Sequence, residues 1–121
     1  MREKTALMAA GCLALAFLAF ELLRPNYVTS VLEAKELTLE GNLTAMRWVL
    51  KQYALDKHER PQSLHDLVAA GYIKQIPADP MTGRNDTWAL EWSGDRESPG
   101  IVNLHSSSSS KSRKGTLYSE W

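Results

Sequence analysis

The first two dozen residues contain an uninterrupted apolar run, and this run limits what the chain can fold into more than any other feature. No charged side chain lies between Ala6 and Phe20, and two leucines extend the run beyond Glu21. About 19 residues at ~1.5 Å rise per residue nearly match the ~30 Å hydrocarbon thickness of a bilayer. Residues 1–24 are therefore predicted to form a transmembrane helix that anchors the chain.

Charges at the two ends of the apolar run predict its orientation. Arg2 and Lys4 precede the run and Arg24 follows it, so the positive-inside bias favours a cytoplasmic N-terminus. Glu21 lies near one end, where its carboxylate can reach the headgroups; at mid-span the same charge would cost several kcal/mol. Residues 25–121 are therefore expected to face away from the cytoplasm, as the head of a single-pass protein.

Three other interpretations of this segment compete with an anchor. Ala14-Leu15-Ala16 has the small residues of a secretory cleavage site, and Ala9-Ala10-Gly11 before Cys12 resembles a lipoprotein signal. The third is a buried helix of a soluble domain. A helix that is apolar on every face needs protein on every side, which a head this small does not supply. We therefore favour the anchor.

Composition restricts the head to one small domain without disulfides. The chain has 121 residues, with 14 basic and 14 acidic side chains, so no global positive field favours nucleic acid. Its one cysteine, Cys12, lies in the apolar run, which leaves the head no disulfide and no cysteine-based zinc site. A basic cluster at Lys111, Arg113 and Lys114 follows five serines and is predicted to be a solvated loop.

A long amphipathic helix is predicted after Pro25, which should end or kink the first helix by removing one backbone donor. Residues 26–56 carry apolar side chains at alternating steps of four and three, which places them on one stripe. The stripe consists of Leu39, Leu43, Met46, Leu50 and Tyr53. The other surface is predicted to hold Lys35, Glu36, Glu40, Arg47, Lys51 and Gln52.

Shorter elements are predicted in the rest of the head. Ser63 and Asp66 resemble a capping box that starts a short helix over residues 63–70, and Gly71 is placed to end it in the left-handed conformation. Prolines and a glycine predict a structured loop over 76–86. Strands are predicted at about 87–92, 101–105 and 116–121. The expected fold class is α+β, with the long helix packed on a small antiparallel sheet.

No pattern of catalytic or metal-binding residues is present. His58, His65 and His105 share no metal-ligand spacing, and turn or capping roles are favoured for Asp79, Asp86, Asp95 and Glu97. Trp48, Trp88, Trp92 and Trp121 are predicted to pack in the core rather than form a sugar- or base-stacking surface. We expect no enzyme, no cofactor and no metal site, because no matched acid, base and nucleophile are found.

Several motifs of the head resemble a known family. They comprise Pro25-Asn26-Tyr27 after the apolar helix, then Pro61-Gln62-Ser63-Leu64, Gly71-Tyr72-Ile73-Lys74, Ile76-Pro77, Asp79-Pro80 and Thr82-Gly83, and finally Gly100-Ile101-Val102 and Tyr118-Ser119-Glu120-Trp121. This series resembles the G-type major pseudopilins of type II secretion and pilin-like proteins in general. The segment Pro61 to Gly83 is the most specific part of the resemblance.

The resemblance implies a pilin-like fold and a structural subunit of a type II secretion pseudopilus or type IV pilus-like assembly in the bacterial inner membrane. Its implied partners are the membrane, other copies or other pseudopilins through the N-terminal helix, and inner-membrane components of the secretion system. The structural residues that it implies are Pro25, Gly71, Pro77, Asp79, Pro80 and Gly83.

Two features of the family pattern differ in this sequence. The family's leader motif has no counterpart here, and aligning Pro25 with the family's kink proline places the mature start near Lys4, so the leader is expected to be missing. The family's calcium site uses an acidic C-terminal loop, whereas this loop runs from Ser106 to Ser110 into basic residues and is not expected to bind calcium. The alternative function is a membrane-tethered periplasmic binding module that does not polymerise.

Overall fold

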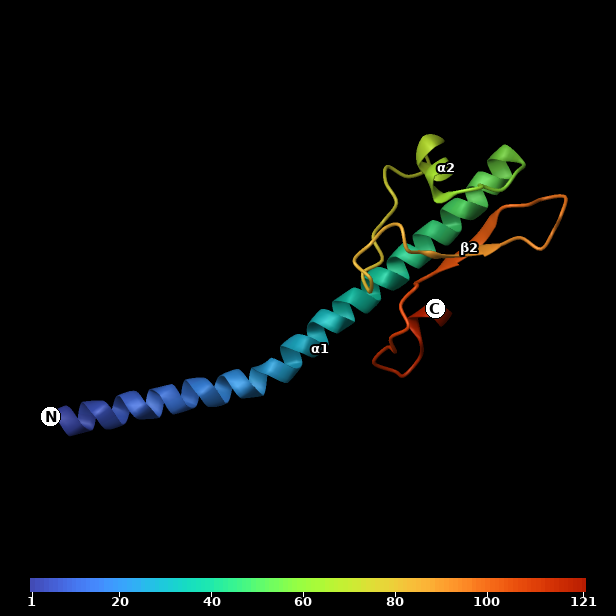
Figure 1. Ribbon diagram of the computed structural model, residues 1–121. Coiled ribbons are helices and arrows are strands. Elements are labelled where there is room, and N and C mark those ends of the chain that lie inside the picture. The colour runs from blue at the N-terminus through green and yellow to red at the C-terminus, as the bar shows by residue number, and fades with distance from the viewer. The chain divides into compact units, whose positions relative to one another are not determined.

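The computed structural model describes residues 1–121, with only the side chain of Pro25 left out. Its elements are the helices α1 (Arg2–Lys57) and α2 (Leu64–Ala69), the strands β1 (Ala89–Trp92) and β2 (Ile101–His105), and a 3-10 turn, η1 (Tyr118–Glu120) (Figure 1). The chain divides into two compact units, Met1–Ala34 and Lys35–Trp121. The fold class is α+β, with one long helix and a small antiparallel sheet.

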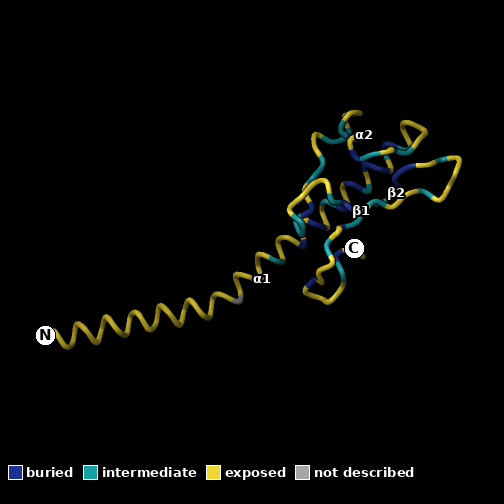
Figure 2. Tube along the Cα trace, viewed as in Figure 1, coloured by how far each residue is buried: buried dark blue, intermediate teal, exposed yellow. Residues whose placement is uncertain are grey.

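The first unit is a helix without a core. Every side chain described in residues 1–24 is exposed, as the trace coloured by burial shows (Figure 2). Pro25 is predicted to end or kink the helix; the helix continues through residue 25, so it does not end there. A proline removes one intrahelical hydrogen bond and costs ~3 kcal/mol, which a helix of 56 residues tolerates because its other turns remain bonded.

The second unit, the head, has its core along the apolar stripe of α1. The stripe residues Leu39, Leu43, Met46, Leu50 and Tyr53 are all buried, as predicted. They pack with Leu64 and Leu67 of α2, with Trp88 directly before β1, with Ile101 and Leu104 of β2, and with Tyr118 of η1. At about 1.5–3 kcal/mol for each fully buried large side chain, this cluster is the main source of the head's stability.

The antiparallel sheet has two strands. Leu90 pairs with Leu104, and the register shifts between Glu91 and Trp92, where Trp92 pairs with Ile101. This irregularity gives β2 one extra residue, so Ile101 and Leu104 are both buried although they are three positions apart. The strand predicted at 87–92 begins at Ala89, and the strand at 101–105 has the predicted bounds.

The strand predicted at residues 116–121 is wrong. This segment forms one isolated bridge, Lys111 with Leu117, and then the turn η1. The Ser112 hydroxyl accepts hydrogen bonds from the backbone N–H groups of Lys114 and Thr116, at 3.3 and 3.2 Å. Such local side-chain bonds offer the backbone an alternative to a strand ladder, and they close a tight turn here instead.

Hydrogen bonds define both ends of the short helix, and its predicted end is confirmed. Asp66 accepts hydrogen bonds from the backbone N–H groups of Gln62 and Ser63, at 2.8 and 3.2 Å. Gly71 has φ of +82°, the left-handed conformation, and the Tyr72 N–H donates to the Leu67 carbonyl at 3.0 Å. The helix itself spans Leu64–Ala69, within the predicted range of 63–70.

Candidate functional site

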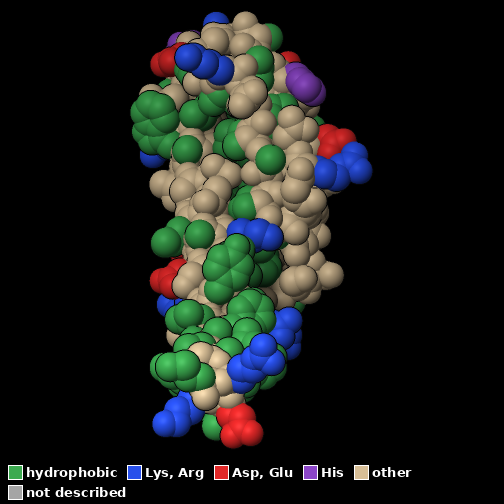
Figure 3. Space-filling model, turned by 90° about the vertical axis from the view of Figure 1, so that its left-hand side faces the viewer, with side chains coloured by type: hydrophobic (Ala, Val, Ile, Leu, Met, Phe, Trp, Pro, Cys, Tyr) green, Lys and Arg blue, Asp and Glu red, His purple; other side chains and the backbone are tan. Residues whose placement is uncertain are grey.

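The exposed apolar surface of the first unit is the largest feature that the fold leaves unused. Its long side chains are strongly exposed; they include Leu7, Met8, Leu13, Leu15, Phe17, Leu18, Phe20, Leu22 and Leu23. Hydrophobic side chains gather over the N-terminal part of α1 in the space-filling view (Figure 3). Monomeric soluble proteins rarely expose contiguous apolar patches of this kind. The helix is long and apolar enough to cross a membrane.

Charged side chains lie near the end of this surface. Glu21 and Arg24 form an exposed ion pair at 3.7 Å, and the Arg24 guanidinium also lies 5.5 Å from the centre of the Phe20 ring. Paired in this way, two charges near the end of an apolar helix are suited to the polar boundary of a bilayer, where long side chains can keep their charged ends in water.

The loop over residues 76–86 is held by a buried aspartate. Asp79 is fully buried, and its carboxylate accepts hydrogen bonds from the Met81 N–H at 2.9 Å and from the Ser106 hydroxyl at 2.6 Å. Its backbone N–H donates to the Arg84 carbonyl at 2.8 Å, and its carbonyl accepts from the Gly83 N–H at 2.7 Å. Asp79 therefore closes this loop and connects it to the serine segment after β2.

Four of the six predicted structural residues meet in this loop. Pro77 accepts a hydrogen bond from the Trp88 indole N–H at 2.8 Å, Pro80 follows Asp79, and Gly83 has φ of +73°. Gly71 instead ends α2, and Pro25 lies in the other unit, where its side chain is outside the described residues. The structure thus brings together Pro77, Asp79, Pro80 and Gly83 and leaves the other two apart.

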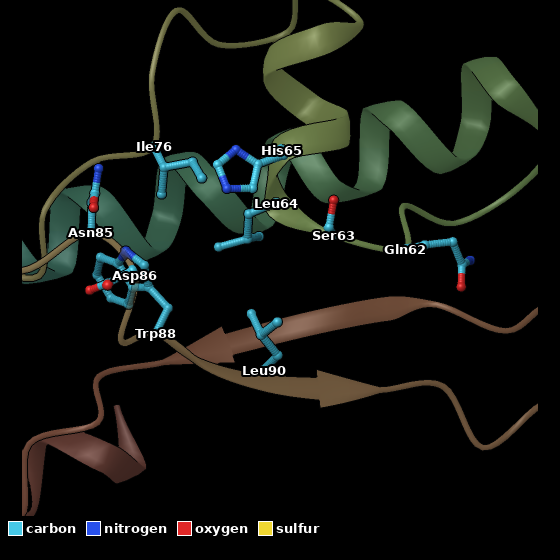
Figure 4. Close-up of a pocket in the computed structure, with 9 residues that line it drawn as sticks. All are labelled: Gln62, Ser63, Leu64, His65, Ile76, Asn85, Asp86, Trp88 and Leu90. Carbon is cyan, nitrogen blue, oxygen red and sulfur yellow. The ribbon is translucent and has the colours of Figure 1, made fainter.

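A shallow pocket of about 340 Å³ lies between α2, this loop and β1 (Figure 4). Leu64, Ile76, Trp88 and Leu90 give it an apolar lining. Polar side chains also line it, among them Gln62, Ser63, His65, Asn85 and Asp86. Its shape suits a small apolar group of a partner better than a substrate that must be enclosed.

The one acidic side chain of the pocket is already paired. A bidentate pair of hydrogen bonds from Arg84, at 2.8 and 2.7 Å, lowers the pKa of Asp86, which stays ionised. An ionised carboxylate bound to a guanidinium is poorly suited to act as a general acid. Throughout the described part of the chain, no three His, Cys, Asp or Glu side chains are grouped closely enough to hold a metal ion.

Two charged side chains of α1 hold the C-terminal segment, and sequence analysis missed both. The Glu36 carboxylate accepts hydrogen bonds from the Arg113 N–H at 2.9 Å, the Arg113 Nε at 2.8 Å and the Tyr118 hydroxyl at 2.9 Å. Arg47 donates to the carbonyl oxygens of Leu104 at 3.1 Å and Trp121 at 2.6 Å.

The sequence predicts Glu36 on the helix surface away from the apolar stripe, and the structure corrects this because Glu36 is buried. It lies three residues before Leu39, so it continues the apolar stripe by one helical step, and this spacing was the available signal. The predicted basic loop is exposed at Lys111, Arg113 and Lys114, but the prediction missed that Arg113 also binds Glu36.

The tryptophans divide between core and surface. Trp88 is buried and Trp121 is half-buried against Tyr118, with ring centres 5.2 Å apart. Trp48 and Trp92 are 62% and 53% exposed, so the prediction that all four pack in the core is wrong for these two. Trp48 lies on the side of α1 opposite the buried stripe, and Trp92 follows the irregularity at the end of β1.

Comparison of the chain with protein-family models, with curated proteins and with solved structures found no match.

Proposed function

We propose that the chain is a structural subunit of a pseudopilus or type IV pilus-like assembly in the bacterial inner membrane. The observation that carries this proposal is the helix α1, a continuous element whose two parts differ in what surrounds their side chains. Residues 6–20 expose an apolar surface without any charged side chain, whereas the C-terminal part of α1 is the central element of a packed head. The N-terminus is cytoplasmic, the head is periplasmic, and the head has no catalytic role.

The residues support an assembly function better than an enzymatic one. The head's two buried carboxylates, Asp79 and Glu36, are engaged on both oxygens by hydrogen bonds that fix loops, which suits them poorly to proton transfer. The exposed apolar helix, by contrast, requires lipid or other helices around it. Copies held in one membrane share an orientation, which favours lateral helix contacts that use the apolar surface.

The first test concerns the membrane anchor. The full chain is expressed in bacteria and its partition between membranes and the soluble fraction is measured for two lysine variants. Leu15→Lys places a charge at mid-span, at a cost of about 2.5–3.5 kcal/mol, and should reduce membrane retention. Leu37→Lys is the control, because Leu37 is about equally exposed but lies outside the predicted span. Equal retention of both variants would contradict the anchor.

The second test concerns assembly. Cys12 is an exposed free thiol on the anchor, so mild oxidation of membranes should join two copies if their anchors lie side by side. Cys12→Ser is the control that removes the product. Expression together with candidate secretion components should increase the crosslinked fraction. Only monomers under all these conditions would count against a fibre subunit.

The pocket at α2 and β1 favours a second candidate function, a membrane-tethered periplasmic binding module that does not polymerise. Its apolar lining around Trp88 and Leu90 suits a partner's side chain. The two functions differ in one measurable result, because a tethered module stays monomeric in the oxidised membrane whereas a fibre subunit forms Cys12 crosslinks.

A further inference from the structure

A second apolar surface lies on the part of α1 that belongs to the head. Leu37, Trp48 and Leu55 are 63%, 62% and 58% exposed. At 3.6 residues per turn these three side chains lie within about 20° of one another around the helix. They face roughly opposite to Met46, which is buried in the core. We call this surface the outer stripe; it consists of Leu37, Gly41, Trp48 and Leu55.

The outer stripe contains a repeat of seven residues. Gly41, Trp48 and Leu55 are spaced by seven, the spacing that keeps one seam of a helix facing a partner helix. The first of them has no side chain and so leaves a notch in the row, and a Cβ added there would meet open space. The other two are large and project from the helix. Seven residues correspond to ~10.5 Å along the axis.

The order of small and large residues discriminates between two ways of pairing parallel helices. With the helices in register, Trp48 meets Trp48 and the notch at Gly41 meets another notch. With one helix shifted by seven residues, Trp48 fills the neighbour's notch and Leu55 packs on the neighbour's Trp48. The shifted arrangement places a large side chain opposite a small residue instead of opposing two tryptophans and two notches, so packing favours it.

We propose that the outer stripe binds a second copy of this chain, shifted by seven residues along parallel α1 helices, with Trp48 of one copy over Gly41 of the other. The small size of the surface argues for this occupant. Three large side chains expose much less than the roughly 800 Å² per partner of a standard interface. A contact of this size needs a high local concentration and a common orientation. The inference rests on the proposed function, because membrane anchoring supplies both.

The test uses the full chain in membranes, with Cys12→Ser as the background. Thr44→Cys is placed in copies with one tag and Lys51→Cys in copies with another. Both positions are exposed, and they are seven residues apart beside the Gly41-Trp48-Leu55 seam. Changing them leaves Trp48 and the notch at Gly41 intact. The shifted pairing predicts that the 44–51 disulfide between differently tagged copies exceeds both the 44–44 and the 51–51 products.

Two variants test the packing itself. Gly41→Leu fills the notch, and Trp48→Ala removes the large side chain that enters it. Each variant should reduce the 44–51 product by about tenfold, as expected when the central residue of a small contact is lost. Trp92→Ala is the control, because Trp92 is another strongly exposed tryptophan but belongs to β1 rather than to the outer stripe. It should leave the product unchanged. Gly41→Leu raises helix propensity, so its effect cannot come from unfolding of α1.

The outcomes separate this inference from the proposed function. A dominant 44–44 or 51–51 product, or a 44–51 product unaffected by Trp48→Ala, would overturn the shifted pairing. If the native Cys12 still joins anchors while the 44–51 product is missing, the outer stripe is not the contact, and the proposed function stands. If neither product forms, both proposals fail.

Discussion

Replacing Glu36 by glutamine should release the C-terminal segment from the long helix. Glu36 is buried on α1, and its two carboxylate oxygens accept three hydrogen bonds from Arg113 and Tyr118. Glutamine has nearly the same shape but only one acceptor oxygen. If that oxygen keeps the two donors on Oε1, the glutamine NH₂ group must face the Arg113 Nε, which is also a donor. One charge-assisted bond is then lost and the Coulombic attraction disappears.

The expected loss of stability follows from this geometry. A hydrogen bond to a charged group contributes about 1.5–3 kcal/mol, and breaking a buried ion pair costs about 3–5 kcal/mol. Arg113 is 35% exposed, so water can solvate its guanidinium once the pair is broken. The cost should therefore lie at the low end, at about 2–3 kcal/mol of the free energy of unfolding.

Denaturant unfolding of the full chain in detergent micelles measures this loss. Hydrogen exchange at the Arg113 amide, which donates to Glu36, reports the same event locally. Glu40→Gln is the matched control, because Glu40 lies one turn further along α1 and is exposed, and it should change stability by less than about 0.5 kcal/mol. Equal stability of the two variants would refute the structural role of Glu36.

The same carboxylate predicts a dependence on pH. Burial raises the pKa of Glu36, but the hydrogen bonds from Arg113 and Tyr118 and the Arg113 charge together lower it below its ordinary value of 4.5. Glu36 thus holds its proton less tightly in the folded state than in the unfolded chain. Its contribution to stability is complete above about pH 4.5 and is lost as the pH falls through the folded pKa. The Glu36→Gln variant should lack this acid-dependent part.

Three further changes should destabilise the head. Gly100→Ala should cost about 3 kcal/mol in thermal or denaturant unfolding, because φ is +139° and a new Cβ would lie 2.5 Å from the Arg60 side chain; Gly94→Ala, with open space around it, should be neutral. Ser106→Ala should cost about 2 kcal/mol in denaturant unfolding, because it removes the donor to one oxygen of the buried Asp79. Arg47→Lys should cost about 1.5–3 kcal/mol and weaken near-ultraviolet circular dichroism, because lysine lacks the planar fork that joins β2 to the chain end.

The parts of the fold that follow a simple period were predictable from the sequence. The buried stripe from Leu39 to Tyr53 recurs at helical spacing, so its inward face could be read directly. Gly71 was placed correctly because a short helix commonly ends in the left-handed conformation. The strand at 101–105 was also recognisable from its apolar residues between turns.

The misplaced features depend on contacts between distant residues. Glu36 and Arg113 are 77 positions apart, and neither has a sequence neighbour that indicates the other. Thr116 to Trp121 has strand-like composition, but the turn at Ser112 and the burial of Tyr118 determine its conformation. Trp48 was predicted wrongly for another reason. The helical period gives the face of the helix on which a residue lies, but not what covers that face.

The small size of the sheet explains why charged groups on α1 matter so much to the head. A two-stranded pair is marginal by itself, and residues 106–121 add only one bridge and one turn to it. The only cysteine, Cys12, lies in the N-terminal apolar run, so no disulfide within the head can hold this segment. Glu36 and Arg47 hold it instead, 11 residues or about 16 Å apart on the same helix. Order in the last 16 residues therefore depends on α1 staying helical between these two positions. A change that removes both side-chain contacts but keeps α1 helical should free the C-terminal segment while the core around Leu39 and Met46 stays packed.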